Sequence, residues 1–416
     1  MLTALHNLSK IWKILGPGML YAGAAVGVSH LVQSTRAGSD YGWSLWWIVI
    51  LANLIKYPFF EYGPRYVAAT GECLLHGYKK LGKWSLIVYI LMTLVTMFAI
   101  QAAVTIVTAG LVANIFQFDL SASYWSLILL IGCGFLLVFD SYEFLNNIVK
   151  YIILTLTLAT ITSLILAKSP ENPQVMHAAF DWGNKVDLLF VVALVGWMPA
   201  PIDLSVWHSG WSQAHDEQKK SRTNLKNQML DFNVGYIGTA LLALAFLGVG
   251  AIVMHPSGKV FPTDAIGFTK ELISLFTNSL GDWSYPIILA AAFCTMLSTT
   301  ITLLDAFPRT LRRSFHLLLG AKQNKTNYSL WLLVVITGTS SLLIFFIGNM
   351  RVMVDLATTI SFVIAPVLAF LNIRVLSQPG IPLEFIPPKW LRVHSYLGLT
   401  CLTVFSCYFL WIRFMS

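Results

Sequence analysis

One histidine stands among small residues in the most unusual apolar stretch of the chain. The stretch covers residues 15–42 and reads LGPGMLYAGAAVGVSHLVQSTRAGSDYG, with His30 near its centre. A neutral imidazole can bind a metal ion, carry a proton or hydrogen-bond a solute. The same side chain can also simply join two helices through a hydrogen bond, and the residue type alone leaves both roles open.

The residues around His30 argue against a continuous helix. Gly23 and Gly27 precede the histidine, and Ser29 adjoins it. In hydrocarbon, a backbone group without a hydrogen-bond partner is costly, so a helix is interrupted only where protein, water or a bound solute satisfies the freed groups. We therefore expect Gly27, Ser29 and His30 to face a binding site.

A second apolar run contains two prolines. It covers residues 188–211 and reads LLFVVALVGWMPAPIDLSVWHSGW, in which Pro199 and Pro201 each lack a backbone donor. The run could still form a kinked but continuous helix, because proline is tolerated in membrane helices. We favour a second interruption, because it matches the first one in position.

The composition is that of a multi-pass membrane protein. The chain has 416 residues, of which 56% are hydrophobic and 11% charged, and its mean hydropathy is +0.70. Polar side chains are too few to cover a soluble globule. The net charge of +8 comes from residues that lie between apolar segments. This distribution favours membrane lipid over nucleic acid as a partner, in a bacterial inner membrane or a plasma membrane.

Eleven apolar segments are long enough to cross a bilayer, which takes about 20 helical residues. They predict an all-α integral membrane protein with eleven transmembrane helices. The segments are 15–42, 43–65, 84–116, 122–139, 144–167, 188–207, 231–254, 283–307, 328–347, 352–373 and 393–414.

Basic residues concentrate in every second connection, which places the N-terminus in the cytoplasm and the C-terminus outside. The other side has only scattered examples, namely Arg36, Lys185, Lys259 and Arg351. The basic side has Lys10, Lys13, Lys79, Lys80, Lys83, Lys219, Lys220, Arg222, Lys226, Arg309, Arg312, Arg313, Lys322, Lys325, Arg374, Lys389 and Arg392.

The two expected interruptions fall in the first and the sixth segments. This spacing suggests two five-helix repeats of opposite orientation, each with its first helix broken at mid-membrane. We expect a single transmembrane domain over residues 1–416, with repeats at about 12–168 and 185–376 and an additional helix at about 393–415.

Five ionisable residues in these segments are candidates for coupling or gating. Asp203 could titrate or attract a cation, although an acid also suits the cap of a resumed helix. Lys56 could extend to the membrane surface or pair with Glu61. Glu61 and Arg65 are four residues apart, which favours a structural ion pair. We expect His208 to lie at the membrane interface.

Three uncharged polar residues could line a passage. Gln101 is the most polar central residue of the third segment, which contains no ionisable acid or base, and Thr358 and Thr359 lie in the tenth. Threonine hydroxyls also commonly bond to their own helix, which is the alternative for these two residues.

Short motifs are spread over nearly the whole chain. Together they resemble the natural resistance-associated macrophage protein (NRAMP) family of proton-coupled divalent metal transporters, which implies an inverted-repeat fold of the LeuT type and transport by alternating access. The motifs are Gly16-Pro17-Gly18, the group Gly38, Ser39, Tyr41 and Gly42, Arg65 with Thr70-Gly71, Met198-Pro199, and Ser298-Thr299-Thr300-Ile301-Thr302.

The resemblance fails at the metal-binding motif of the first helix. Aligned without gaps, the family's Asp-Pro-Gly-Asn falls on residues 27–30. Gly27 then replaces the coordinating aspartate, and His30 replaces the asparagine. The acids that the family carries in its third helix are missing as well.

The sixth segment keeps only part of the implied metal site. Met198 keeps the thioether ligand and Val195 could offer its carbonyl, but Ala200 replaces the family's histidine. A site made of His30, Met198 and carbonyls would be neutral and softer than a site for Mn²⁺. Trp197 could instead give an organic solute or cation an aromatic wall, and the helix ends could receive an anionic group.

These observations leave three functions open. The first is an NRAMP-related secondary transporter with a metal ion as the substrate that the family implies. The second is a transporter of a non-metal small solute, and the third is a receptor or sensor that does not transport. The chain has no GxSxG, no HExxH and no paired acids at a spacing useful for catalysis, so we expect no enzyme and no cofactor, and we predict no oligomeric state.

Overall fold

The computed structural model describes residues 15–139, 143–169, 180–320, 325–345 and 349–415. These residues form helices joined by connections, and they contain no strand. The all-α class predicted from the sequence is therefore confirmed. Lys10, Lys13 and Lys322, which were used above to orient the chain, lie outside the described residues.

The first half of the chain begins with three consecutive helical pieces in place of one long helix. Its elements are α2 (Pro17–Ala25), the π-helical η1 (Ser29–Ser34), α3 (Thr35–Tyr41), α4 (Trp46–Thr70), α5 (Leu74–Leu81), α6 (Lys83–Phe116), α7 (Ala122–Val138) and α8 (Glu143–Leu166).

The second half begins with two pieces and continues with longer helices. Its elements are α9 (Lys185–Trp197), α10 (Asp203–Lys219), α11 (Leu225–Val249), the π-helical η2 (Gly250–Met254), η3 (His255–Ser257), α12 (Ala265–Leu280), η4 (Asp282–Ser284), α13 (Tyr285–Leu319), α14 (Lys325–Phe345), α15 (Met350–Leu376), η5 (Leu383–Phe385) and α16 (Lys389–Met415).

Six described helical stretches have the length and apolar composition needed to cross a membrane. They are Lys83–Phe116, Leu225–Ser257, Asp282–Leu319, Tyr328–Phe345, Met350–Leu376 and Lys389–Phe414. α4 is 25 residues long but contains Lys56, Glu61 and Arg65, which lower its apolar content. The six stretches indicate an integral membrane protein that crosses the bilayer several times.

Two described helices, α5 and α12, are absent from the segments predicted above. Both are amphipathic, so neither contains a continuous apolar run of spanning length. α12 begins where the carboxylate of Asp264 accepts a hydrogen bond from the Gly267 N–H at 2.7 Å, which is a common helix cap. Only a periodicity search would have found these two helices.

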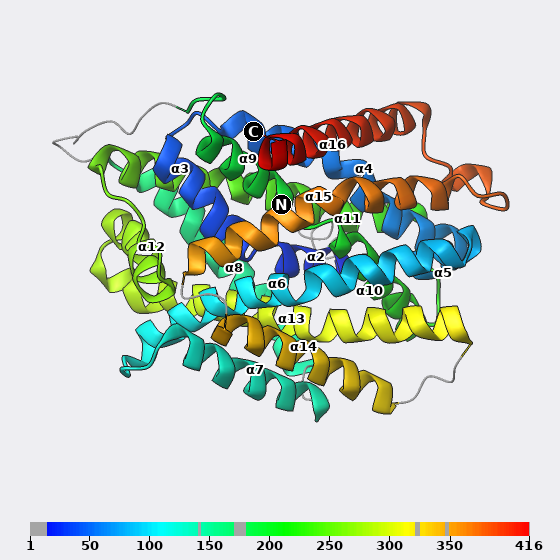
Figure 1. Cartoon of the computed structure of the whole chain (residues 1–416), viewed down its shortest axis with the longest axis horizontal. Coiled ribbons are helices and arrows are strands. Elements are labelled where there is room, and N and C mark those ends of the chain that lie inside the picture. The colour runs from blue at the N-terminus through cyan, green and yellow to red at the C-terminus, as the bar shows by residue number, and fades with distance from the viewer. Residues whose placement is uncertain (1–14, 140–142, 170–179, 321–324, 346–348, 416) are drawn as a thin grey trace, which may run out of the picture.

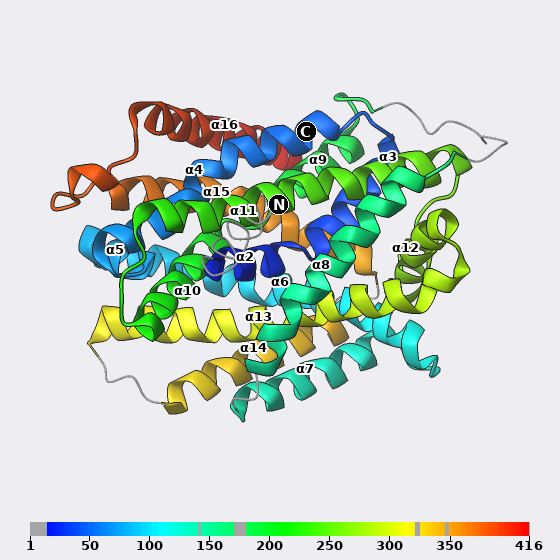
Figure 2. The ribbon, with the colours of Figure 1, turned by 180° about the vertical axis from the view of Figure 1, so that it is seen from behind.

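α2 lies in the middle of the bundle in both views of the ribbon (Figures 1 and 2) and contacts α10, α11 and α13. At the periphery, α16 packs on α4 and α15, while α7 and α14 lie along the opposite edge (Figure 1). The outer helices expose apolar side chains, among them Ile131, Phe135, Leu330, Leu397 and Val404. Lipid would cover these side chains, whereas protein surrounds the backbone ends of α2.

Glycines bring the first interrupted segment very close to α11. A Cβ atom on Gly18 would lie 2.1 Å from the carbonyl oxygen of Asp231. A Cβ atom on Gly235 would lie 2.3 Å from the carbonyl oxygen of Gly18. Gly38 and Gly250 form a second contact of this kind between α3 and η2. Small residues permit this close approach of helix backbones in membranes.

Asp231 of α11 also holds the start of α2. Its carboxylate accepts hydrogen bonds from the backbone N–H groups of Gly16 at 2.9 Å and of Gly18 at 2.7 Å. A carboxylate satisfies unpaired donors at a helix N-terminus and complements the helix dipole. Both halves of the first interrupted segment are thus fixed to the same long helix.

We predict that Gly235→Ala destabilises the fold, because the added methyl group would collide with the backbone of Gly18. Overpacking costs about 1–3 kcal/mol, which should lower the thermal unfolding midpoint of the detergent-purified protein. Gly238→Ala is the control, since nothing lies within 4 Å of a Cβ atom at that position of α11. Equal midpoints for the two variants would contradict the close contact.

Candidate functional site

The first interruption lies between α2 and η1. α2 ends at Ala25, and the π-helical segment begins at Ser29. The carbonyl of Gly27 accepts hydrogen bonds from the N–H groups of His30 at 3.1 Å and Leu31 at 2.9 Å. The Ser29 hydroxyl donates to the Ala25 carbonyl at 2.7 Å. Protein groups therefore satisfy much of the backbone that the interruption frees.

The second interruption lies between α9 and α10. α9 ends at Trp197 and α10 begins at Asp203, with residues 198–202 connecting them. Both Pro199 and Pro201 fall in this connection, where their missing N–H groups prevent the helical hydrogen-bond ladder from continuing. The last carbonyls of α9 therefore lack donors from their own helix.

Lys56 of α4 supplies the missing donors. Its side chain is fully buried, and Nζ donates hydrogen bonds to the carbonyl oxygens of Val195 at 2.6 Å, Gly196 at 2.8 Å and Ala200 at 3.4 Å. An ammonium group has three donors, so each proton has one carbonyl. A positive charge is also favoured at the C-terminal end of a helix. Lys56 therefore stabilises the broken end of α9.

This arrangement corrects the predictions made for Lys56. The lysine neither extends to the membrane surface nor pairs with Glu61. Glu61 instead forms the expected ion pair with Arg65, with Nη2 at 2.5 Å from Oε1. Arg65 also donates to the carbonyl of Phe385 at 3.3 Å, which joins α4 to η5. These contacts support a structural role for Glu61 and Arg65.

The Lys56 contact also engages a carbonyl expected to bind metal. The oxygen of Val195 already accepts a hydrogen bond from a buried ammonium group at 2.6 Å. A metal ion at this oxygen would be repelled by the lysine, with about 4 kcal/mol for each unit charge at 4 Å and an effective dielectric constant of 20. The carbonyl is not available to a dication while Lys56 is charged.

His30 is directed at α11. Its Nε2 lies 2.9 Å from the carbonyl oxygen of Thr239, and its Nδ1 lies 2.7 Å from the hydroxyl of Ser29. The ring also contacts the ring of Phe246 at 6.5 Å between centroids. Because a carbonyl only accepts, Nε2 carries the proton of a neutral ring, and the single Ser29 hydroxyl proton is shared between the Ala25 carbonyl and the Nδ1 lone pair. This geometry favours the role of joining two helices.

Met198 and His30, the two predicted metal ligands, lie at different interruptions. Met198 is fully buried in the second interruption, while both nitrogens of His30 have protein partners. Among the described residues, no three His, Cys, Asp or Glu side chains gather in a group that could hold a metal ion. The role of these two residues as metal ligands stays a prediction, and a metal ion at the His30 ring would have to replace Ser29 or Thr239 there.

Thr299 of α13 occupies the space beside Gly27. A Cβ atom on Gly27 would lie 3.2 Å from both Cγ2 and Oγ1 of Thr299. The alignment places the family's metal-binding aspartate at this position, so a threonine contact replaces a carboxylate. The first interruption consequently contributes no negative charge at Gly27.

A small cavity, called the central cavity below, lies between the interruptions. Its volume of about 30 Å³ is enough for roughly one water molecule. None of the described residues around it is charged. The lining consists of Ala24, Ala25, Val28, Ser29, Ile100, Val104, Trp197, Pro201, Leu204, Trp207, Thr299 and Leu303.

Two of the remaining predicted site residues are held by other helices. The indole N–H of Trp197 donates to the hydroxyl of Ser361 at 2.8 Å, so Trp197 lines the central cavity with a fixed ring. The amide of Gln101 donates to the hydroxyl of Thr105 at 3.0 Å and to the carbonyl of Thr300 at 3.3 Å. Gln101 thus joins α6 to α13, and it is not among the residues that line the central cavity.

The two threonines of α15 behave differently from each other. Thr358 is buried, donates to the Val354 carbonyl of its own helix at 2.8 Å and accepts a hydrogen bond from Gln33 at 3.4 Å. Thr359 is half-buried, and none of the hydrogen bonds described for the site includes it. The alternative of bonding within the helix therefore holds for Thr358.

Asp203 and His208 both lie on α10, and both are buried. Asp203 is the first residue of the helix, where a carboxylate complements the helix dipole. Its Oδ1 has no hydrogen-bond partner among the described residues. The ring of His208 packs between Tyr21 at 5.5 Å and Phe232 at 5.9 Å. His208 is therefore enclosed by protein, and its predicted position at the membrane interface stays a prediction.

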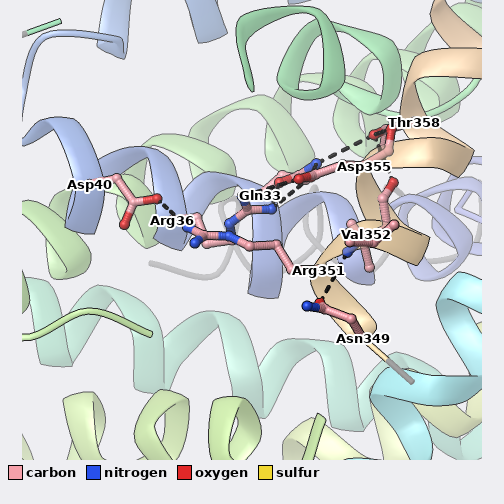
Figure 3. Close-up of polar contacts among 9 residues, drawn as sticks. Gln33, Arg36, Asp40, Asn349, Arg351, Val352, Asp355 and Thr358 are labelled. Atoms are coloured by element: carbon pink, nitrogen blue, oxygen red, sulfur yellow. Dashed lines mark hydrogen bonds and ion pairs between the residues drawn. The ribbon is translucent and has the colours of Figure 1, made fainter. Parts of the chain in front are cut away.

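A polar cluster, called the outer cluster below, joins η1 and α3 to α15 (Figure 3). Nη1 of Arg36 lies 2.8 Å from Oδ1 of Asp355, and the amide of Gln33 donates to the same oxygen at 3.2 Å. Arg351 pairs with Asp40 at 2.8 Å. Two ion pairs thus cross between α3 and α15.

Sequence reasoning missed the outer cluster. Arg36 is buried, and its guanidinium lies 5.0 Å from the ring centre of Phe190, so it also contacts α9. A weak signal was present in the sequence, because Arg351 and Asp355 are one helical turn apart. Gln33, Arg36 and Asp40 follow the same helical spacing. Which helices meet at these residues could not be read from spacing alone.

A larger cavity, called the vestibule below, lies at the other end of the first interrupted segment. Its volume is about 580 Å³, within the usual range of ligand pockets. Trp207 lines both the vestibule and the central cavity. The vestibule is lined by Leu15, Gly16, Pro17, Leu20, Cys73, Leu75, Val206, Trp207, Gly210, Trp211, Ala214, His215, Gln218, Thr302, Asp305, Ala306, Arg309, Thr310, Arg312 and Arg313.

The fold is similar to that of solved transporters whose sequences differ greatly from this one. A crystal structure of the Eremococcus coleocola manganese transporter with an aromatic bis-isothiourea compound gives a TM-score of 0.68 at 13% identity and covers 96% of this chain and 86% of that chain. MhsT in complex with L-phenylalanine gives 0.61 at 14% identity, with 94% and 97% coverage. At these identities the comparisons show the fold alone.

Sequence comparison identifies the family. The natural resistance-associated macrophage protein-like family model matches residues 18–412. An uncharacterized protein of Pasteurella multocida (strain Pm70) is 36% identical over 403 residues, which cover 95% of this chain and 91% of that protein. The resemblance noted from short motifs is therefore confirmed, and the chain belongs to the natural resistance-associated macrophage protein (NRAMP) family.

Proposed function

We propose that this NRAMP-family chain is a secondary transporter that works by alternating access and moves a small solute other than a divalent metal ion. Membership of a transporter family supports transport over an enzymatic role. The observation that supports a solute other than a metal ion is that the ammonium group of Lys56 donates hydrogen bonds to three carbonyls of the second interruption.

The proposed architecture is an inverted repeat with eleven spans. The repeats cover residues 12–168 and 185–376, of which residues 12–14 lie outside the described part, and α16 is the additional span. The breaks after α2 and after α9 support this proposal, because each ends the first spanning segment of its repeat. The N-terminus lies in the cytoplasm and the C-terminus outside.

Lys56 occupies backbone carbonyls of the second interruption that could otherwise bind a metal ion. A dication sheds strongly bound water on entering a site, and carboxylates normally offset that loss. At the interruptions, Gly27 and Ala200 offer no such ligand, and the ammonium group of Lys56 places a positive charge beside Met198. A metal ion would have to displace a fully hydrogen-bonded ammonium group without gaining a carboxylate.

Asp203 is the proposed coupling group. It is the acid at the start of α10, it is buried, and one of its carboxylate oxygens has no hydrogen-bond partner among the described residues. Lys56 at the end of α9 and Asp203 at the start of α10 place opposite charges on the two helix ends of the second interruption. A change in the charge of Asp203 would therefore alter the field across the break.

The outer cluster and the vestibule support alternating access. Ion pairs between α3 and α15 join the helices at one end of the first interrupted segment, while a cavity of about 580 Å³ lies at its other end. We assign this arrangement to a state that is closed at the outer cluster and accessible at the vestibule. Opening of the outer cluster and closing of the vestibule would give the opposite state.

Loss of the Lys56 charge should destabilise the protein. We predict that Lys56→Met leaves the buried carbonyls of Gly196 and Ala200 without donors, at a cost of about 1–3 kcal/mol for each unpaired group, while the Val195 carbonyl keeps only the Met198 N–H at 3.3 Å. The thermal unfolding midpoint in detergent should fall well below that of the wild type. Lys79→Met removes an exposed lysine of α5 and should leave the midpoint unchanged. An unaltered midpoint for Lys56→Met would show that the three hydrogen bonds contribute little.

Metal binding tests the assignment directly. We expect isothermal titration of the wild type with Mn²⁺ to give no binding heat, and Mn²⁺ uptake into proteoliposomes to match that of empty vesicles. The double variant Lys56→Met/Gly27→Asp removes the cation and adds a carboxylate, so it should gain Mn²⁺ affinity. Lys79→Met/Gly27→Asp keeps the Lys56 charge and should bind much less tightly. Micromolar Mn²⁺ binding by the wild type would refute the proposal and restore the metal transporter.

Alternating access can be followed through Ala214, an exposed residue that lines the vestibule. We predict that Asp355→Asn weakens the Arg36 ion pair and slows maleimide labelling of an Ala214→Cys reporter, because the vestibule closes as the outer cluster opens. Asp282→Asn changes an exposed acid that has no ion pair in the described structure and should not alter labelling. Unchanged labelling in Asp355→Asn would favour a receptor that keeps the fold without alternating.

A further inference from the structure

We propose that the vestibule binds a small organic oxyanion, a solute with a carboxylate or phosphate group, and that Arg312 and Arg313 recognise it. The inference names the solute class of the proposed transporter and therefore rests on the proposed function.

The vestibule contains more positive than negative charge. Its described lining includes Arg309, Arg312 and Arg313 and a single carboxylate, that of Asp305. Nε of Arg309 lies 2.6 Å from both oxygens of Asp305, and the hydroxyl of Tyr328 donates to the same group at 2.7 Å. The one acid is thus neutralised within the lining itself.

The other two arginines have neutral partners. Nη2 of Arg313 donates to the amide oxygen of Gln213 at 2.8 Å. The guanidinium of Arg312 lies 5.8 Å from the ring centre of Tyr328, and its buried Nε has no hydrogen-bond partner among the described residues. Neither Arg312 nor Arg313 forms an ion pair with a residue that the structure describes. A planar guanidinium with unused donors is suited to binding carboxylate or phosphate through two parallel hydrogen bonds.

A basic cluster at this end of a membrane helix also has a topological explanation, the positive-inside rule. That rule requires only charges near the membrane surface. Lys219 and Lys220 meet the requirement from exposed positions outside the vestibule lining. Arg312 and Arg313 are instead half-buried in a cavity, where a charge without a counter-ion is costly. An anionic ligand would offset that cost.

The field of these charges reaches the neighbouring helix α5. Burial, followed by the positive charge of Arg313, holds the pKa of His76 below its usual value. The same field would repel Mn²⁺ and attract an anion into the vestibule. The arginines of the vestibule and the ammonium group of Lys56 therefore disfavour divalent cations at two separate places.

Trp207 marks the path from the vestibule to the central cavity. Its ring lines both cavities and packs edge to face on Phe307 at 5.0 Å. A solute held by Arg312 and Arg313 would have to pass this ring to reach the interruptions. The central cavity holds about one water molecule, so it must widen before a solute enters.

Protection of the Ala214→Cys reporter from maleimide tests the proposal. We expect sodium phosphate or sodium succinate to slow labelling relative to sodium chloride of equal ionic strength, and glycerol to have no effect. Phosphate and succinate separate the two oxyanion classes. In Arg312→Gln/Arg313→Gln, the anion concentration that gives half protection should rise about tenfold or more, because charge-assisted hydrogen bonds are lost. Lys219→Gln/Lys220→Gln removes the same charge outside the lining and should keep protection.

Two outcomes would overturn the inference: no protection by either oxyanion, or equal loss of protection in the two double variants. Arg313→Gln alone is a milder variant for which the same loss is expected if the double variant does not fold. The response of the reporter to Asp355→Asn needs no ligand. Failure of anion protection with that response intact would therefore reject the oxyanion and leave the proposed transporter standing.

Discussion

Three backbone carbonyls at the second interruption, two near the end of α9 and one in the connection after it, accept hydrogen bonds from a single lysine of α4. Pro199 and Pro201 end the helical ladder, so without the lysine the buried carbonyls of Gly196 and Ala200 would have no donor, and that of Val195 would have only the Met198 N–H. Lys56 satisfies three of them at 2.6–3.4 Å and places its charge at the negative end of the helix. The position of α4, the shape of the second interruption and the chemistry of the site all depend on this contact.

The contact of Lys56 with these carbonyls is consistent with the loss of the family's metal ligands in this chain. A carboxylate is absent at Gly27 and a histidine at Ala200, and in their place the chain carries a fixed cation of its own. A buried ammonium group and a bound dication would repel one another, so the lysine and the missing acids are consistent with each other. The vestibule, the larger of the two cavities, is lined by three arginines and one aspartate, so it too would repel a dication.

Much of the fold could be predicted from the sequence, because long apolar runs and paired prolines act locally. Gly27 lies between α2 and η1 and Pro199 between α9 and α10, and the Glu61–Arg65 pair follows from spacing on one helix. The partners of Lys56, His30 and Arg36 could not be predicted. Each depends on which helices meet in space, which is information that a periodic pattern does not contain. His30 faces Thr239 of α11, more than two hundred residues away in the chain.

The glycine contacts described above also bear on movement. At Gly18 with Gly235, and again at Gly38 with Gly250, backbone meets backbone without an intervening side chain. Neither piece of the first segment can slide along or rotate against α11 and η2 without steric overlap. These elements must therefore travel together as one rigid body, and relative displacement during a transport cycle must take place at surfaces joined by side chains, such as the one between α3 and α15.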